Sequence, residues 1–310
     1  MASQELIDCH IHCFPSEEDG RFFMDRMVRW QNHPWVGTLG QVLEMHKKAG
    51  IARANILMYT PARLYYEDAV AALPSKGSRD EAIATIRRSV VRRIEGNNDW
   101  CVKLIKEHPR FTFFCGVDVT FMSEEEMLRG VERWVANGAK GVKIVPQGMQ
   151  VYGNDPRLLP LFDYCQSKAI PVLSQSGGRP PSLGIAYAVT PKFGETLRKF
   201  PKLKFIFAHM AHFGWMENGG ADALADVFAA CPNAYADLSL QFGPIAKGEQ
   251  TREAMVALIR RLGADRILFG TNFPLADSAE AADVYRSLSL TESERERISS
   301  QNFLRLTARN

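Results

Sequence analysis

Short apolar segments and longer amphipathic segments alternate along most of the chain. The apolar segments are rich in Val, Ile, Leu and Phe, which is typical of strands buried on both faces of a parallel sheet. The amphipathic segments carry apolar residues at helical spacing, and the one at Ser123–Asn137 begins with a Ser-x-x-Glu capping box. Strands are expected at Glu5–His12, Arg53–Met58, Phe111–Val117, Gly141–Val145, Ile170–Ser174, Leu203–Ala208, Ala234–Leu238 and Arg266–Phe269.

Each expected strand is followed by a helix or by a longer excursion that contains one. Eight such units in 310 residues predict an α/β fold, a (β/α)8 TIM barrel with residues 1–310 as a single domain. The excursions 13–37 and 59–99, after strands one and two, are expected as insertions near the site. Gly and Asn cluster at Glu95–Asn98, which predicts a break in the helical region 79–108. No Gly-x-Gly-x-x-Gly follows a strand, which disfavours a dinucleotide fold.

The first strand ends in a His-x-His pair. Strict alternation gives it one polar face and one apolar face, with Asp8, His10 and His12 opposite Ile7, Cys9 and Ile11. The apolar set suits contact with the outer helices, and two imidazoles at i and i+2 can bind one divalent metal. Asp8 is then expected to hold His10 by a hydrogen bond. The alternative is a buried strand with two hydrogen-bonded histidines, which is the more common origin of an isolated His-x-His.

Polar residues recur at the carboxyl ends of the other expected strands, where TIM barrels carry their active sites. The set comprises His10, His12, Lys143, Gln175 with Ser174 and Ser176, His209, His212, Asp237, Ser239 and Asn272. The remaining histidines, His33, His46 and His108, are expected at the surface. Any single member has a structural explanation, such as an ion pair at Lys143 or a loop cap at Asp237. The set as a whole predicts an active site.

Composition narrows the class of partner. With 46% hydrophobic residues and a formal net charge of only +3, the chain can bury a large core, and neither nucleic acid nor a membrane surface is indicated. Six scattered cysteines without a Cys-x-x-Cys pair, and the lack of a signal peptide or long apolar run, predict a cytoplasmic protein with reduced thiols. The expected partner is a small-molecule substrate, and a homodimer is left open.

The chain resembles the amidohydrolase-related family, the branch of the amidohydrolase superfamily that contains the aminocarboxymuconate-semialdehyde and resorcylate decarboxylases. The resemblance rests on Ile7–His12, Gly141–Pro146, Asn154–Pro160, Ile170–Gly178, Lys199–Gly214, Cys231–Ser239, Leu262–Pro274 and Gln301–Thr307, which together reach from one end of the chain to the other. Such enzymes hydrolyse C–N or C–O bonds, or decarboxylate aromatic and enol acids, usually around one divalent metal. The resemblance implies His10 and His12 as metal ligands, and His209 as the histidine that binds substrate or moves a proton.

Two positions depart from the family pattern. Gln175 stands where the fifth strand of the family ends in a ligand histidine, and the segment Gly270–Pro274 has Asn272 in place of the aspartate of Gly-Thr-Asp-x-Pro. An amide oxygen can coordinate a cation, but it brings no negative charge and cannot act as a general base. His10 and His12 with Gln175 and Asn272 are therefore expected to bind Zn weakly or not at all.

Three functions remain open at this point. The first is an enzyme with a weakened metal, and the second is a metal-free enzyme that uses His10, His12, His209 and also His212 for acid–base chemistry and hydrogen bonding. Asn272 is included among the expected catalytic residues. The third is a non-catalytic ligand-binding protein. The second is favoured, because zinc sites with only two strong ligands are unusual. The reaction is hydrolysis, decarboxylation or a related lyase or cyclisation step on an anionic or aromatic substrate. The expected substrate contacts are Lys143, Gln175, His212, Asp237, Arg63, Arg179, Tyr152, Phe213, Trp215 and Phe242.

Overall fold

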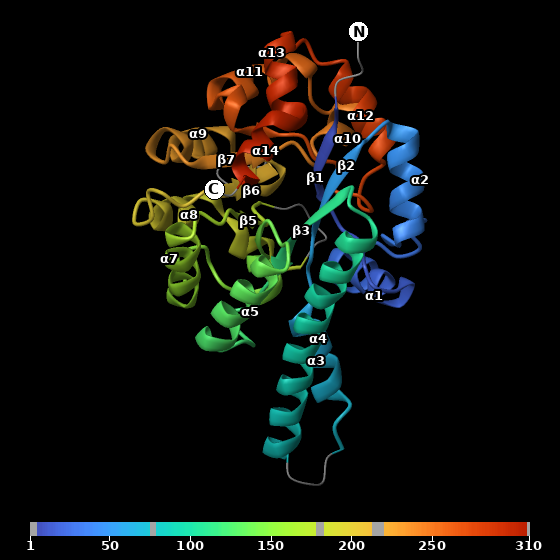
Figure 1. Ribbon diagram of the computed structural model, residues 1–310, viewed down its shortest axis with the longest axis vertical. Coiled ribbons are helices and arrows are strands. Elements are labelled where there is room, and N and C mark those ends of the chain that lie inside the picture. The colour runs from blue at the N-terminus through green and yellow to red at the C-terminus, as the bar shows by residue number, and fades with distance from the viewer. Residues whose placement is uncertain (1–4, 75–78, 178–182, 213–219, 309–310) are drawn as a thin grey trace.

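The computed structural model describes residues 5–74, 79–177, 183–212 and 220–308. The described residues form one sheet of parallel strands whose order follows the chain (Figure 1). The strands are β1 (Ile7–Ile11), β2 (Arg53–Leu57), β3 (Phe111–Gly116), β4 (Gly141–Ile144), β5 (Val172–Ser174), β6 (Phe205–Phe207), β7 (Ala234–Asp237) and β8 (Ile267–Leu268). The sheet closes on itself because the Cys9 N–H donates to the Phe269 carbonyl and Ile11 pairs with Phe273. The predicted (β/α)8 TIM barrel is confirmed.

Helices follow the strands around the barrel. They are α1 (Glu17–Phe22), α2 (Leu39–Ala49), α3 (Ala62–Ala71), α4 (Arg79–Glu107), α5 (Glu124–Ala136), α6 (Pro146–Met149), α7 (Leu159–Ser167), α8 (Thr190–Leu197), α9 (Gly220–Ala230), α10 (Phe242–Ala246), α11 (Arg252–Leu262), α12 (Ser278–Arg286), α13 (Glu292–Glu296) and α14 (Asn302–Thr307). The predicted capping box of α5 is present. Ser123 Oγ accepts the Glu126 N–H, and Glu126 Oε2 accepts the Ser123 N–H at 2.8 Å.

The core has two layers. A large cluster lies between the outer faces of the strands and the helices. A smaller cluster joins residues from strands on opposite sides of the barrel, so it must fill the barrel interior. It contains Ile7, Cys9, Leu57, Phe114, Leu173, Ile206, Ala208 and Leu268, with Phe303 and Leu306 of α14 packed against them. This interior plug leaves the polar side chains of the carboxyl ends above a solid apolar base.

The predicted division of the first strand into two faces is wrong for Ile7, Cys9 and Asp8. Ile7 and Cys9 belong to the interior cluster, whereas the Asp8 carboxylate lies 3.6 Å from the Nε2 atom of His46 on α2. The register between β1 and β2 shifts between Asp8 and Ile11, so the simple alternation of faces does not continue along the strand. The prediction that His46 lies at the surface is also wrong, because this side chain is fully buried.

The excursion after β2 forms a helical hairpin of α3 and α4 that projects from the barrel (Figure 1). The predicted helix break at 95–98 is wrong, since α4 is continuous. Asn98 explains this, because its side chain donates to the carbonyls of Ile94 and Gly116 and accepts the Gly116 N–H at 2.8 Å. A polar residue that suggested a turn instead ties the helix to β3.

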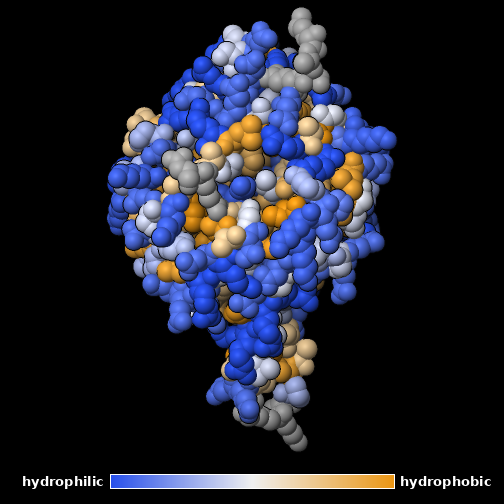
Figure 2. Space-filling view, viewed as in Figure 1, coloured by the Kyte–Doolittle hydropathy of each residue, from blue (hydrophilic) through white to orange (hydrophobic). Residues whose placement is uncertain are grey.

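Hydrophilic residues cover most of the face shown in Figure 2, with scattered hydrophobic ones between them. Among the described residues, the large hydrophobic side chains classed as exposed are Trp30, Tyr152 and Leu304. All six cysteines are buried and free of disulfides. None of the described helices is long and apolar enough to cross a membrane.

Candidate active site

A cavity of about 440 Å³ lies where the strands end. Its polar lining comes from strand ends and the turns after them, and includes His12, Lys143, Gln175, His209, His212 and Asn272. Its apolar lining includes Phe23, Met27, Val28, Trp30, Tyr59, Val145, Leu240, Pro244 and Leu275. Four of these apolar residues come from the excursion after β1. A cavity of this size, largely apolar with a few converging polar groups, is typical of a site for a small molecule.

Not every expected substrate contact lies at this cavity. Arg63 lies on α3, lines a separate cavity and donates from Nη2 to the Met149 carbonyl at 2.9 Å. Tyr152 is exposed away from the cavity lining, and Phe242 is buried between Phe269 and Tyr285. Three others lie outside the described residues: Arg179, Phe213 and Trp215.

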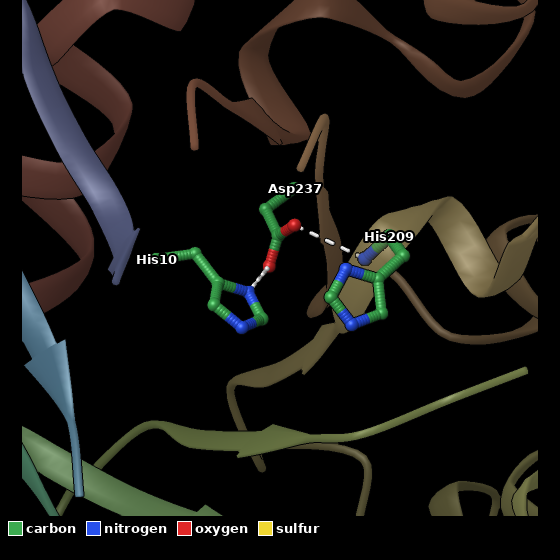
Figure 3. A group of neighbouring side chains, drawn as sticks. All are labelled: His10, His209 and Asp237. Atoms are coloured by element: carbon green, nitrogen blue, oxygen red, sulfur yellow. Dashed lines mark hydrogen bonds and ion pairs between the residues drawn. The ribbon is translucent and has the colours of Figure 1, made fainter. Parts of the chain in front are cut away.

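Asp237, at the end of β7, organises the two histidines beside it (Figure 3). Its Oδ2 atom accepts a hydrogen bond from Nδ1 of His10 at 2.9 Å. Its Oδ1 atom accepts the backbone N–H groups of His209 and Ser239 at 3.0 Å each, and also the Ser239 hydroxyl. Asp237 is fully buried and its oxygens are occupied within the protein, so in this structure it orients other groups. Ser239, noted at a strand end but not expected as a site residue, is part of this network.

The Asp237 carboxylate fixes the proton positions of His209. Ser239 Oγ has one proton, which it donates to Asp237, so the oxygen accepts from Nδ1 of His209 at 2.7 Å. The Nε2 atom of His209 lies 2.9 Å from Oε1 of Gln175. When Nε2 is protonated, it donates to this oxygen. When Nε2 carries a lone pair, the Gln175 amide can donate to it after a half-turn of the amide group. The Gln175 amide can therefore form a hydrogen bond with His209 whether or not Nε2 is protonated.

His10 and His12 each have one nitrogen held by the protein. Because Nδ1 of His10 donates to Asp237, its Nε2 atom carries a lone pair, and this buried atom has no hydrogen-bond partner in the described structure. Nδ1 of His12 donates to the Leu57 carbonyl at 3.1 Å, which leaves a lone pair on its Nε2 atom as well. The His10 ring centroid lies 5.5 Å from that of His12 and 4.8 Å from that of His209. Imidazole lone pairs are therefore concentrated at the base of the cavity.

Burial lowers the pKa of His10, His12 and His209 well below the ordinary imidazole value. Neighbouring positive charges, including Lys143, lower these pKa values further. The three rings are consequently neutral near pH 7, and each can accept a proton or ligate a cation.

The backbone after β6 is unusual. The four residues His209 to His212 all have left-handed φ angles between 47° and 59°, a conformation that costs non-glycine residues roughly 1–2 kcal/mol each. The turn is held by the His209 N–H bond to Asp237 and by Gln241, which donates to the His209 carbonyl at 2.8 Å. It places the rings of His209 and His212 4.9 Å apart, both on the cavity. Strained backbone of this kind is concentrated at functional sites.

Asp8 joins the ends of β1 and β8. Its Oδ1 atom accepts the N–H groups of His10 and Thr271 at 3.1 and 2.9 Å, and its Oδ2 atom accepts the Thr271 hydroxyl at 2.6 Å. The expected bond from Asp8 to His10 thus exists, but it reaches the backbone and not the ring. Asn272, which follows Thr271 in the chain, has a φ of 68° and donates its N–H to the His10 carbonyl at 2.7 Å. Its buried Oδ1 atom has no partner among the described residues.

Replacing Asp8 by Ala is expected to lower the free energy of unfolding by about 3 kcal/mol, because three buried donors lose their acceptor. Asp8→Asn is the matched control. Its amide oxygen can still accept both N–H groups and its NH₂ can donate to Thr271, so we expect a loss of about 1 kcal/mol. Urea unfolding monitored by circular dichroism measures both. Equal stability of the two variants would show that these hydrogen bonds do not hold the strand ends.

Part of the cavity lining fits a divalent metal. The unpartnered Nε2 atom of His10, the Nε2 lone pair of His12 and the Oδ1 atom of Asn272 are suitable donors, and Gln175 offers a further amide oxygen. All four donors are neutral. A second group within the described residues, His10, His209 and Asp237, has ligand atoms within 4.8 Å of one another. Nδ1 of His10 already donates to Asp237, and Nδ1 of His209 already donates to Ser239, so we interpret this group as an orienting network.

Comparisons with known proteins agree with this architecture. A family model described as amidohydrolase matches residues 7–306. A search of curated proteins found no match. Among solved structures, 2,6-dihydroxybenzoate decarboxylase from Rhizobium is 18% identical, with a TM-score of 0.70 and 98% of each chain covered.

Two further solved structures have the same fold. 5-Carboxyvanillate decarboxylase from Sphingomonas paucimobilis is 15% identical, with a TM-score of 0.70, 98% of this chain and 99% of that chain covered. A dihydroxybenzoic acid decarboxylase from Polaromonas sp. JS666 with bound manganese is 18% identical, with a TM-score of 0.68 and 98% and 97% covered. At these identities the structures establish the fold, whereas the family match spans nearly the whole sequence. The chain belongs to the amidohydrolase family of enzymes.

Proposed function

We propose that this enzyme decarboxylates a small aromatic or enol carboxylic acid by histidine acid–base chemistry, with His209 as the group that moves the proton. The observation that carries the proposal is the His209 ring on the cavity wall. Its Nδ1 atom is held by Ser239, which in turn donates to Asp237, and its Nε2 atom beside Gln175 is the nitrogen left to exchange a proton. Decarboxylases of aromatic acids share the fold, which supports the choice of reaction.

The reaction needs one proton to be moved. In an acid R–COOH, the proton must leave oxygen and reach the carbon that loses CO₂, so that R–H and CO₂ result. Neutral His209 accepts the proton on Nε2, and the resulting imidazolium donates it to carbon. Its lowered pKa makes the imidazolium a strong proton donor. Between the two transfers, the protonated Nε2 atom of His209 can donate a hydrogen bond to Gln175 Oε1.

The remaining polar groups bind and orient the acid. Lys143, His212 and Asn272 line the cavity and can contact the oxygen atoms of the substrate, while Phe23 and Leu275 can pack on a flat ring. The apolar lining limits the access of water to the reacting carbon.

A metal-supported version of the site is the second candidate. It is favoured by the unpartnered Nε2 atom of His10 and Oδ1 atom of Asn272. The Polaromonas decarboxylase with the same fold carries manganese. A divalent ion held by His10 and His12, with Asn272 and Gln175 as weak ligands, would supply a Lewis acid for a substrate oxygen.

The proposal is tested by measuring CO₂ release from carboxyl-labelled acids. The panel contains 2,6-dihydroxybenzoate, 5-carboxyvanillate and the cyclic β-oxo acid 2-oxocyclohexane-1-carboxylate, and matched aromatic amides and esters test hydrolysis. We expect CO₂ release from at least one acid, at a rate about 10³-fold or more above that without enzyme. Hydrolysis of an amide or ester without CO₂ release would instead establish a hydrolase. Binding of acids without any turnover would favour a ligand-binding protein.

A further inference from the structure

Lys143 enters the interior of the barrel beside the cavity. It is the third residue of β4, and it pairs in register with Gly116 on β3 and Leu173 on β5. Because neighbouring residues of a parallel sheet in register share a face, and Leu173 belongs to the interior cluster, the lysine side chain also points inward. It is 1% exposed and lines the cavity. Its stem is therefore fixed in the base of the site.

The amine of Lys143 lacks a partner. Its buried Nζ atom makes no hydrogen bond to any of the described residues. Asp237 is the carboxylate that stabilises its charge most, but the oxygens of Asp237 already accept from His10, His209 and Ser239. A lysine with only a structural role at this depth would be paired. The amine of Lys143 can therefore find a partner only in a molecule bound in the cavity.

Burial lowers the pKa of Lys143 to about 7, and the Asp237 carboxylate only partly opposes this shift. A substantial fraction of the amine is then unprotonated at neutral pH, whereas an exposed lysine would be almost fully charged. An uncharged primary amine beside a substrate cavity is a nucleophile for carbonyl carbon, and desolvation is a known route to such lysines.

We infer that Lys143 forms an imine with the carbonyl group of its substrate, and that the substrate is a β-oxo carboxylic acid, the keto form of an enol acid. The inference rests on the proposed function in taking the substrate to be an acid that loses CO₂. It goes beyond that function because it assigns covalent catalysis to Lys143 and requires a ketone two bonds from the carboxylate.

The chemical steps balance. The Nζ lone pair attacks the carbonyl carbon, the C=O π pair moves to oxygen, and a proton passes from nitrogen to that oxygen. Protonation and loss of this hydroxyl as water give a protonated C=N bond. The electron pair of the C–CO₂⁻ bond then moves toward the C=N bond, which releases CO₂ and leaves an enamine. His209 first takes up the consumed proton on Nε2 and then donates it to the enamine carbon, and water hydrolyses the iminium to the ketone and free Lys143. One proton is consumed per carboxylate.

The experiment is reductive trapping. The full-length protein is incubated at pH 7 with 2-oxocyclohexane-1-carboxylate and sodium cyanoborohydride, and the modified lysine is located by peptide mass spectrometry. We expect one adduct, on Lys143, formed at least about tenfold faster than on any other lysine. Lys143→Met should abolish it, and Lys247→Met, which removes another cavity lysine, should not. Benzoate, which has no ketone, should give no adduct.

A second measurement covers the event that Lys143→Met does not fold. Imine formation exchanges the carbonyl oxygen with water, so the wild-type protein should accelerate the loss of ¹⁸O from the labelled ketone group of the same probe. Adducts spread over surface lysines, with no adduct on Lys143 and no accelerated ¹⁸O loss, would overturn the inference. If CO₂ were still released in that case, the proposed decarboxylation would stand without the imine. Trapping on Lys143 without CO₂ release from any acid would support the imine and remove the decarboxylase function.

Discussion

His209→Asn is expected to lower kcat for the substrate found in the CO₂-release panel by about two orders of magnitude or more. The asparagine keeps the backbone N–H that donates to Asp237, so the turn after β6 retains its hydrogen bond. It cannot carry a proton between substrate atoms, because an amide does not titrate near neutrality. Steady-state kinetics measure the effect, and circular dichroism checks that the variant is folded.

The matched control is His108→Asn, which makes the same change of side chain at a histidine outside the cavity lining, beside Phe111 at the start of β3. We expect its kcat to remain within about twofold of the wild type, since surface substitutions have small effects. If His209→Asn raises KM but leaves kcat unchanged, His209 binds the substrate and does not transfer the proton. Unchanged kinetics in a folded variant would remove His209 from the reaction.

The barrel itself was predictable because each strand leaves a strong local signal. Central strands such as Phe205–Phe207 are apolar on both faces, and the helices between them carry capping boxes and helical periodicity. The polar residues at the base of the cavity were predictable from the same pattern. Once the strand ends are known, the fold brings His12, Lys143, Gln175 and Asn272 to one cavity whatever their distance in sequence.

Errors arose where a local irregularity overrides the pattern. The register of β1 shifts between Asp8 and Ile11, so Asp8 and the histidines after it do not share one face as a strict period of two predicts. The left-handed turn at 209–212 contains no glycine, so the sequence had no signal for it. The role of Ser239 depends on its hydrogen-bond partners, because its hydroxyl donates to Asp237 and accepts from Nδ1 of His209. The sequence does not show that these three residues are neighbours. The excursion 13–37 has no clean period, yet it supplies Phe23 and Trp30 to the cavity.

The double variant Gln175→His with Asn272→Asp is expected to bind Zn at least about a hundredfold more tightly than the wild type. Both positions line the cavity, and Asn272 Oδ1 is a buried atom without a partner in the described structure. A carboxylate there adds a negatively charged ligand beside the Nε2 lone pairs of His10 and His12, and the new imidazole adds a strong nitrogen ligand. Isothermal titration calorimetry measures the affinity, with each single variant as a control.

The same variant is expected to lose the wild-type reaction, for two reasons that the structure makes specific. First, Gln175→His removes the amide that can hydrogen-bond to His209 Nε2 whether or not this nitrogen is protonated. Second, a bound cation with its water would occupy space in the cavity that the substrate needs. The single variant Asn272→Asp, which keeps Gln175, separates these effects if it is assayed with and without Zn. Affinity no better than wild type in the double variant would mean that strand ends five and eight do not face one cation. Tight Zn binding together with full wild-type activity would contradict the metal-free mechanism.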